Sequence, residues 1–415
     1  MTRMSRSNVI TVFEHQALRV GDQGFTDNQL LALQRFHEEK DFPYYTLIHN
    51  GVKFTEHVGV LQVGKTIIEI LPKADREAKT DTWRRLLIGM IRASGLLTIS
   101  APTSSTLAIR RNAILDLYVE HFIAELEYIV HRGMAKRYRK TEGNLTSHRG
   151  RIIFAKHLRL NHVHQERVYA EYTEFTREHV LHQILYKALR LLPRLNVDAS
   201  LSGRIQSMML SFPEMPDVKV SERTFARVVL NRSTQHYKAA LDIARMLLLN
   251  YHPDVSRGNN DVLALMFDMN VLWERFVYAS LRKHLPQDIE VRAQQAKAYW
   301  KREGSNRTTI RPDIVVMSGH LSFVLDTKWK TIDARKISSA DLHQMYVYHE
   351  YFDARKVALI FPSASATFAR GSYVSPEHAQ PVDKECSLIP VTIETESTTT
   401  WQKQIASSIT QWLDV

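Results

Sequence analysis

The sequence predicts a multidomain α+β protein with three parts. We expect a small β-rich N-terminal domain over residues 1–100, a mostly helical, basic middle region over residues 101–255, and an α/β domain with a mixed sheet over residues 256–415. Short strand-like runs near the N-terminus, helix-period apolar patterns in the middle and a helix-strand-strand-helix-strand order near the end predict this division. A chain of 415 residues is also too long for one ordinary core.

The N-terminal part alternates short strands with one helix. The helix, over residues 25–40, has Thr26 or Asp27 as its N-cap. Its apolar face is expected to contain Leu30, Leu31, Leu33 and Phe36. Runs rich in β-branched and aromatic residues predict strands over residues 9–13, 45–48, 58–63 and 66–71.

Residues 59–66 fit the phosphate-binding pattern GxxxxGK[ST]. A phosphate-binding loop of this kind needs a helix after it, whereas Thr66 is followed by a second β-like run that ends at Pro72. The positions inside the pattern also favour strand. We therefore predict a hairpin that turns at Gly64-Lys65, and expect no nucleotide to bind to this chain.

The remaining elements follow from apolar periodicity and from proline and glycine punctuation. In the middle region, helices are expected over residues 112–131, 178–192, 201–210 and 233–249. In the last part we expect a helix over residues 262–285, strands over 313–317 and 321–325 joined at Ser318-Gly319, a helix over 340–352, a strand over 357–361 and a helix over 401–413.

Composition narrows the class of partner. The net charge of +11 and the isoelectric point near 9.5 favour a polyanion, with nucleic acid first. A membrane surface is less suitable, because the amphipathic C-terminal helix has only Lys403 as a cation. No apolar run is long enough to span a membrane, and the N-terminus does not resemble a signal peptide. The single cysteine, Cys386, fits a reducing, cytoplasmic setting.

Two strands of the last part bring charged residues together. Pro312-Asp313 opens the first strand, and Asp326-Thr327-Lys328 closes the second. Asp326 and Lys328 are two residues apart, so their side chains point to one face, at the sheet end where Asp313 also lies. Two carboxylates and an ammonium suit phosphodiester hydrolysis, because carboxylates hold Mg²⁺ and Lys328 can orient or deprotonate water or stabilise charge. The backbone carbonyl of Thr327 could complete the metal shell.

Two helices add candidate residues. Glu274 lies among apolar residues of the expected 262–285 helix, although by itself it would be interpreted as an exposed carboxylate. Gln344 and Tyr348 are four residues apart on the following helix, so they share a face. Both could also simply belong to a packing surface.

A cluster of cations occupies the middle region. They can be interpreted as a phosphate-contacting surface or as a solvated helix end, and the overall charge favours DNA contact without sequence readout. These cations are Arg132, Lys136, Arg137, Arg139, Lys140, Arg149 and Arg151. Metal binding by the histidines of the same region would need a tighter pairing with Cys or acidic ligands. We therefore interpret them as surface or packing residues, namely His131, His148, His157, His162 and His164.

Together these motifs resemble a known family. Pro312-Asp313, Asp326-Thr327-Lys328 and Gln344 to Tyr348 are similar to the PD-(D/E)xK nuclease core with a QxxxY helix. The segment 267–276 resembles the helix before that core in the McrC family, whose members are nuclease subunits of the McrBC modified-cytosine restriction system. The segments 149–152 and 70–73 also resemble this family, so the likeness covers nearly the whole chain.

The resemblance implies roles for these residues. Asp313 and Asp326 would be metal ligands, Lys328 the catalytic lysine, and Glu274 a carboxylate supporting the metal site. Gln344 and Tyr348 would position the site or the DNA backbone. The metal would be Mg²⁺, with Mn²⁺ as an alternative.

The resemblance also implies partners. These would be double-stranded, modified DNA and an McrB-like AAA+ GTPase hexamer, which the N-terminal part would dock on and stimulate. Cleavage of both strands would follow from pairing of two active sites through dimerised complexes.

Two other functions remain open at this point. One is a RecB-type repair nuclease, because the QxxxY helix also occurs there. The other is an adaptor that binds DNA and a motor without cutting, against which the intact Asp313, Asp326 and Lys328 argue.

Overall fold

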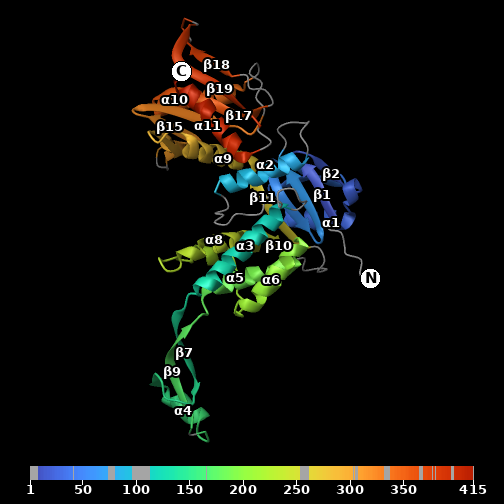
Figure 1. The fold of residues 1–415 in the computed structure, drawn as a ribbon, viewed down its shortest axis with the longest axis vertical. Helices are drawn as coiled ribbons and strands as arrows, with labels where there is room; N and C mark the ends of the chain where they lie inside the picture. Colours follow the sequence, from blue (N-terminus) through green and yellow to red (C-terminus); the bar gives the residue numbers. More distant parts are fainter. Residues whose placement is uncertain are drawn as a thin grey trace. The chain divides into compact units, whose positions relative to one another are not determined.

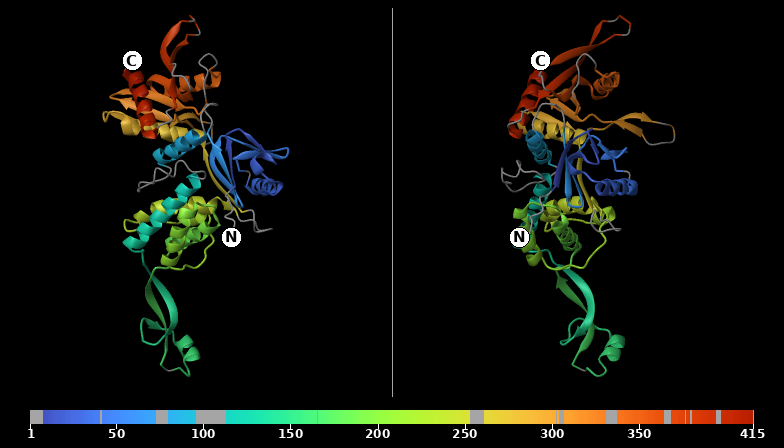
Figure 2. Two further views of the ribbon diagram at one scale, coloured as in Figure 1. Left: turned by 45° about the vertical axis from the view of Figure 1, so that its right-hand side comes forward. Right: turned by 90° about the vertical axis from the view of Figure 1, so that its right-hand side faces the viewer.

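The computed structural model describes residues 8–40, 42–72, 80–95, 113–164, 166–252, 261–301, 303, 307–330, 337–363, 368–375, 377–378, 380–393 and 397–414. The chain forms two compact units, one of residues 1–114 with 253–415 and one of residues 115–252. The first unit thus combines the two ends of the chain. The assignment of three functional parts to residues 1–100, 101–255 and 256–415 remains a prediction. Figures 1 and 2 show the ribbon in three views.

The N-terminal half of the first unit contains two sheets. Strands β1, β6, β5 and β11 are neighbours in that order, and β2, β4 and β3 form a second sheet. The β1–β6 pair is parallel, whereas β5 pairs antiparallel with both β6 and β11. The elements are β1 (Asn8–Phe13), β2 (Ala17–Arg19), α1 (Asp27–Lys40), β3 (Tyr45–Ile48), β4 (Gly51–Phe54), β5 (His57–Val63), β6 (Thr66–Leu71) and α2 (Thr80–Ala93).

The segment resembling a phosphate-binding loop is a hairpin, as predicted. Val63 pairs with Thr66 across the turn, and Gly64 has a positive φ of 58°. β6 follows directly where a phosphate-binding loop would need a helix. Both strands are buried along their length, so the polar backbone of this segment is used for sheet pairing.

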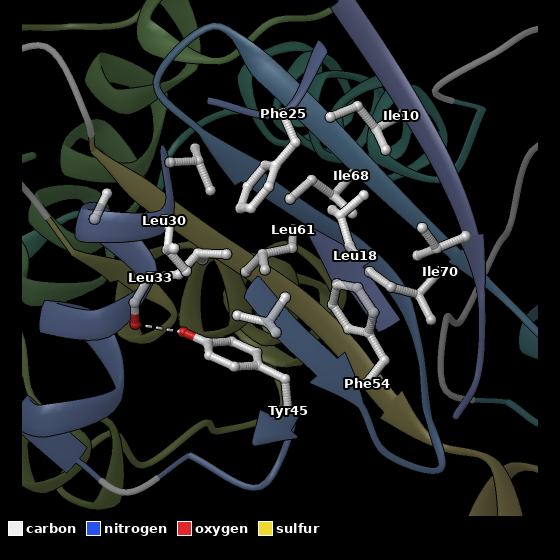
Figure 3. Packing of buried hydrophobic residues seen from close by; sticks show 14 of the residues in the cluster. Ile10, Leu18, Phe25, Leu30, Leu33, Tyr45, Phe54, Leu61, Ile68 and Ile70 are labelled. Carbon is white, nitrogen blue, oxygen red and sulfur yellow. Dashed lines mark hydrogen bonds between the residues drawn. The ribbon is translucent and has the colours of Figure 1, made fainter. Parts of the chain in front are cut away.

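The core of this half lies between α1 and the sheets (Figure 3). Leu30, Leu33 and Phe36 of α1 are buried there, as expected. Tyr45 joins the same core and donates its hydroxyl to the carbonyl of Leu33 at 2.7 Å. Leu31 was wrongly expected on the buried face: it is 49% exposed, because it points away from the other three side chains around the helix.

The expected 262–285 helix is wrong at its start. Residues Val262–Asp268 form strand β11, and helix α9 covers Met269–His284. A short apolar run is compatible with a helix or a strand, and here the pairing with β5 makes it a strand. Asp268 then caps α9 by accepting from the amides of Asn270 and Val271 at 2.8 and 3.3 Å. The close approach of β11 requires Gly59, since a Cβ there would lie 2.1 Å from the Leu265 carbonyl oxygen.

A six-stranded mixed sheet forms the C-terminal half of the first unit, as predicted. Its order is β12-β15-β16-β17-β19-β18. The β16–β17 and β17–β19 pairs are parallel, and the other pairs are antiparallel. The elements are β12 (Ile289–Ala293), β15 (Ile314–Ser318), β16 (Leu321–Thr327), α10 (Ser339–Phe352), β17 (Ala354–Ser363), β18 (Ala369–Val374), β19 (Pro381–Thr392) and α11 (Thr398–Asp414). A separate hairpin joins β13 (Lys297–Lys301) to β14 (Arg307–Ile310).

Helices cover both faces of this sheet. Val324 of β16 packs with Met345 of α10 in one apolar cluster. The preceding residue, Phe323, contacts the ring of Trp412 in α11 with centroids 5.7 Å apart. Neighbouring strand residues point to opposite faces, so α10 covers one face and α11 the other. α9 also packs against β16 and α11.

The second unit is a helical body that carries a β-ribbon. Its elements are most of α3 (Ala113–Arg132), β7 (Arg137–Leu145), β8 (Arg151–Ile152), α4 (Phe154–Leu160), β9 (Val168–Thr176), α5 (Val180–Leu191), α6 (Ala199–Ser211), α7 (Glu222–Ala226), α8 (Lys238–Leu249) and β10 (Tyr251–His252). Long strands β7 and β9 pair antiparallel and lead from the helices to α4 (Figure 1). The expectation of a mostly helical middle is therefore wrong over residues 137–145 and 168–176, which form these two strands. In the described part of the chain, no helix is long and apolar enough to cross a membrane.

Candidate active site

Strand β16 delivers Asp326 and Lys328 to the face covered by α10. Asp326 lies two residues after Val324, so it shares the face that packs on α10. Lys328 follows the strand, and its amide donates to the carbonyl of Ile360 in β17 at 2.9 Å, which continues the ladder. The pairing predicted from sequence spacing is therefore present: Nζ of Lys328 lies 2.9 Å from Oδ2 of Asp326.

Gln344 and Tyr348 of α10 complete this group. The Gln344 amide donates to Oδ1 of Asp326 at 3.2 Å and to the Tyr348 hydroxyl at 2.8 Å. Its oxygen accepts from Nζ of Lys328 at 3.3 Å. The Tyr348 hydroxyl in turn donates to the carbonyl of Arg311 at 3.1 Å. The i, i+4 pair thus connects the end of β16 to the segment that leads into β15.

Asp313 joins the site through Thr327. One carboxylate oxygen of Asp313 accepts from the amide of Thr327 at 2.6 Å and from its hydroxyl at 2.7 Å. Glu274 of α9 is reached through Gln294, whose side-chain amide donates to Glu274 at 2.7 Å and whose backbone amide donates to the carbonyl of Asp313 at 2.9 Å. All six predicted catalytic residues therefore belong to one connected group.

Asp341 is a member that the sequence analysis missed. Its carboxylate lies 3.4 Å from Nζ of Lys328 and 3.0 Å from Nζ of Lys330. It occupies the position three residues before Gln344 on α10, so the two share a helix face. This spacing of three residues could have indicated Asp341 as a candidate site residue. Gln294 gave no such signal, because only the pairing of β12 with β15 brings it to Asp313.

Trp329 is a second residue that the sequence analysis missed. Its indole NH donates to the carboxylate of Glu14 at 2.9 Å, and its ring centroid lies 5.5 Å from that of Trp273. Trp273 donates to the carbonyl of Ile360 at 3.4 Å, the oxygen that also accepts from the Lys328 amide. The residue after Lys328 is thus fixed from both halves of the first unit.

Burial and neighbouring charges perturb the acids and the lysine. Burial and the charge of Asp313 raise the pKa of Asp326 to about 6, against the opposing effect of Lys328. Burial alone would lower the pKa of Lys328, but the carboxylates of Asp326 and Asp341 outweigh burial and raise it. Burial, with the charge of Asp313, raises the pKa of Glu274. The structure therefore favours an ammonium at Lys328.

The residues fit a hard cation bound through few protein ligands. Oδ2 of Asp326 is buried and accepts no hydrogen bond from the described residues, although Lys328 balances its charge. Within the described ranges, no three His, Cys, Asp or Glu side chains form a ready-made metal cluster. Mg²⁺ is compatible with this, because it is held through one or two carboxylates together with waters and substrate phosphates.

The seven predicted DNA-contacting cations lie in the second unit, and all are exposed. Only Arg132 belongs to a helix end, whereas Arg137, Arg139 and Lys140 lie on β7, so the solvated-helix interpretation applies to one residue. Several contact neighbours: Arg139 and Arg151 pair with carboxylates of β9 or the turn after it, and Lys136 and Arg149 lie over the rings of Phe175 and Tyr172. Contact with DNA stays a prediction for this cluster.

Comparisons with known proteins agree with this fold. The chain matches the family model described as McrBC 5-methylcytosine restriction system component over residues 52–362. It is 19% identical over 254 residues to the type IV methyl-directed restriction enzyme EcoKMcrBC of Escherichia coli strain K12, a match covering 58% of this chain and 72% of that protein.

Two solved structures are similar to this one. One is a half-complex from a tetradecameric assembly of Thermococcus gammatolerans McrB AAA+ hexamers with bound McrC, with a TM-score of 0.72 and 20% identity, covering 97% of this chain and 100% of that one. The other is the cryo-EM structure of the Thermococcus gammatolerans McrBC complex, with a TM-score of 0.50 and 20% identity, covering 67% and 88%. At this identity the structures establish a shared fold. Because the family match spans well over half of the chain, and as the McrC resemblance predicted, the chain belongs to the McrBC 5-methylcytosine restriction system component family.

Proposed function

We propose that this chain is the metal-dependent endonuclease subunit of a modification-dependent restriction complex, of the PD-(D/E)xK type. The observation that carries the proposal is the convergence of Asp326, Lys328 and Gln344 at the end of β16, with Asp313 linked through Thr327. A buried carboxylate with a raised pKa beside a lysine is costly to place in a fold and is typical of functional sites.

The metal-binding residues would be Asp313, Asp326 and the carbonyl of Thr327, with Glu274 in support. Mg²⁺, or Mn²⁺ in its place, would supply a Lewis acid for the phosphate oxygen. Glu274 has a raised pKa from burial and from Asp313, so a cation that neutralised Asp313 would favour its ionised form.

The chain's own residues do the remaining work. Lys328 is held as an ammonium by two carboxylates, so its role is to stabilise the negative charge that develops on the phosphate. Gln344 fixes the carboxylate of Asp326 and the hydroxyl of Tyr348 with one amide group. Tyr348 is tied to the Arg311 carbonyl, and thereby keeps α10 in register with the Asp313 strand. Such fixation limits reorganisation during the reaction.

The partner would be an AAA+ GTPase. The Thermococcus gammatolerans assembly contains McrB AAA+ hexamers with bound McrC, and this chain has the same fold. Its single GxxxxGK[ST] segment is a hairpin, so GTP hydrolysis would have to come from such a partner. The substrate would be modified double-stranded DNA, and paired complexes would cut both strands.

The test is cleavage of plasmid DNA with and without methylated cytosine in Mg²⁺, by the chain alone and with its GTPase partner and GTP. The proposal expects cleavage only when the partner, GTP and the modification are all present. Cleavage of unmodified DNA without GTP would instead place the chain with repair nucleases. A complete lack of cleavage under all conditions, with partner and DNA bound, would favour the adaptor interpretation.

A further inference from the structure

The hairpin of β13 and β14 is an exposed projection from the C-terminal half of the first unit. Every residue of β13 is exposed, as are Arg307, Thr308 and Thr309 of β14. Figure 2 shows this light-orange hairpin leaving the sheet in the right-hand view. It forms a two-stranded sheet of its own, and no other strand of the described residues pairs with either edge.

The base of the hairpin is anchored on the helix that carries Gln344 and Tyr348. Nζ of Lys297 donates to the carbonyl of Tyr351 at 2.8 Å and lies 4.7 Å from the centroid of the Phe352 ring. Tyr299 contacts the Tyr351 ring edge-on at 5.3 Å. These contacts hold the hairpin against the C-terminal end of α10 and leave its remaining side chains exposed.

The exposed side chains are cationic and aromatic. Lys301 and Arg307 are directly opposite each other in the register, and within the described residues neither forms an ion pair. Like charges in a cross-strand pair are destabilising, so this pair is tolerated at a cost that a bound anion would remove. Trp300, next to Lys301, is 58% exposed. Glu303 is the only carboxylate among the described residues between 295 and 311.

The hairpin also joins two residues of the active site. Gln294, which contacts Glu274 and Asp313, comes just before β13, and Arg311, whose carbonyl accepts from Tyr348, comes just after β14. At ~3.3 Å per residue, the strand from Arg311 to Arg307 covers roughly 13 Å. That length corresponds to about four phosphates along one DNA strand, at ~3.4 Å each.

We propose that the β13–β14 hairpin is a DNA-contacting wing of the nuclease site. Lys301 and Arg307 bind backbone phosphates beside the phosphate at Asp326 and Lys328, and Trp300 contacts the sugar or base next to them. The proposal deepens the proposed nuclease function by naming a substrate surface in the same domain. A protein partner fits this surface less well than DNA does. Lys301 and Arg307 lie opposite each other without a neutralising carboxylate among the described residues, and such a pair of cations matches the regularly spaced phosphates of a DNA strand.

The test measures DNA affinity of the full chain without divalent cation, so that no cleavage occurs. The probe is a fluorescein-labelled duplex, titrated over a series of NaCl concentrations. For Lys301→Gln with Arg307→Gln, the slope of log affinity against log salt should decrease in magnitude by about 1.8, since each released phosphate contact contributes about 0.9. Trp300→Ala should weaken binding about 5-fold with an unchanged slope, because it removes contact area and no charge.

The matched control is Arg282→Gln with Lys283→Gln. These exposed cations lie in the last turn of α9, and their removal changes net charge equally. The control should shift the slope by far less than the hairpin variant. Equal slopes for the hairpin variant and wild type, with unchanged thermal unfolding, would overturn the proposal. Loss of binding to the GTPase partner with an unchanged DNA slope would assign the hairpin to a protein contact and overturn it as well.

This experiment is independent of catalysis. If wild type and Asp326→Ala cleave alike, the nuclease assignment fails, yet the salt slopes still report whether the hairpin contacts DNA. If cleavage depends on Asp326 but the slopes do not change, only the wing assignment fails.

Discussion

Lys328 is the residue on which the site converges. Its Nζ lies 2.9 Å from Asp326 and 3.4 Å from Asp341, and it also donates to Gln344. If Asp326 bound a cation, as proposed, Asp341 and Gln344 would remain to hold the lysine in place. We therefore infer that Asp341 is a positioning residue. Its second oxygen is in turn held by Lys330.

Replacing Asp341 by asparagine should lower the single-turnover rate of DNA cleavage by roughly 10- to 100-fold, the size of effect expected when a reacting group is misplaced by about 1 Å. DNA affinity measured without divalent cation should stay within about 2-fold, since Asp341 faces the lysine and Lys330 rather than solvent. Asp341→Glu should restore part of the rate.

The control for this variant is Glu350→Gln on the same helix. Glu350 pairs with Lys384 of β19 and is exposed, so its loss should leave cleavage unchanged. An Asp341→Asn protein that cleaves at the wild-type rate would show that Lys328 is positioned without it.

At the residue scale, the sequence predicts which side chains share a face, through the i, i+2 spacing of a strand and the i, i+4 spacing of a helix. Asp326 with Lys328, and Gln344 with Tyr348, follow from these periods and meet as predicted. Asp341 lies within the same helical periodicity. Gln294 and the Trp329–Glu14 contact could not be predicted, because they depend on which strands pair and on how distant segments pack.

At the scale of elements, α2 is joined to β6 by a buried ion pair. The Arg84 guanidinium donates to both carboxylate oxygens of Glu69 at 2.6 Å, and these side chains are 2% and 0% exposed. Arg84→Met should lower the free energy of unfolding by about 3–5 kcal/mol, because it leaves an unpaired buried carboxylate.

Urea unfolding of the full chain measures this, with Arg355→Met as the surface control. Arg355 pairs with exposed Asp383 at 3.3 Å, and its loss should cost about 0–1 kcal/mol. Glu69→Leu combined with Arg84→Met should regain much of the stability lost in the single variant. An Arg84→Met protein as stable as wild type would contradict the stabilising role of the Arg84–Glu69 ion pair.

One series of hydrogen bonds connects the residues just before β7 with those just after β9. The Ala135 amide donates to the Tyr237 hydroxyl at 2.9 Å, this hydroxyl and Nε2 of His182 are 2.9 Å apart, and Nδ1 of His182 lies 2.6 Å from the carbonyl of Arg177. Neutral His182 with its proton on Nδ1 satisfies all three contacts. A second proton on Nε2 would face the tyrosine's own proton.

The hydrogen bonds of His182 predict that the stability of the protein depends on pH. Burial lowers the pKa of His182 to about 4 from its usual 6.5. Because the folded chain disfavours the protonated form, its contribution is complete above pH 6.5 and up to about 3 kcal/mol is lost as the pH falls to about 4. Thermal unfolding followed across this range should show a smaller dependence in His182→Gln. Exposed His148→Gln is the control, and equal pH profiles for all three proteins would contradict the prediction.

The types of the elements were predictable where an apolar pattern extended over the whole element or where glycine and proline marked the turns. The predicted strands over residues 45–48 and 66–71 and the helix over 340–352 are present. The segment 262–268 was not predictable, because six apolar residues fit helix and strand alike until β5 supplies a partner. The ribbon of β7 and β9 was also missed. β7 is mostly exposed and polar, and β9 is only partly buried and has charged residues among its aromatic ones, so neither shows the apolar alternation of a core strand.

At the scale of the whole molecule, the first unit is built from both ends of the chain. β11 inserts next to β5, and Glu14 of the N-terminal half contacts Trp329, the residue after Lys328. This arrangement links the part expected to dock on a GTPase with the end of β16. Three sequential parts were expected from the order of strands and helices along the chain, which does not reveal the pairing of β5 with β11.

The central claim is that Asp326 and its neighbours cut DNA. Its most direct test compares wild type, Asp326→Ala and Asp383→Ala in single-turnover cleavage of methylated DNA, with Mg²⁺, the GTPase partner and GTP. Asp383 is an exposed aspartate of the same domain, so it controls for loss of a carboxylate. We expect Asp383→Ala to cleave like wild type and Asp326→Ala to be slower by at least about 100-fold. Equal cleavage by all three proteins would contradict the assignment of this site.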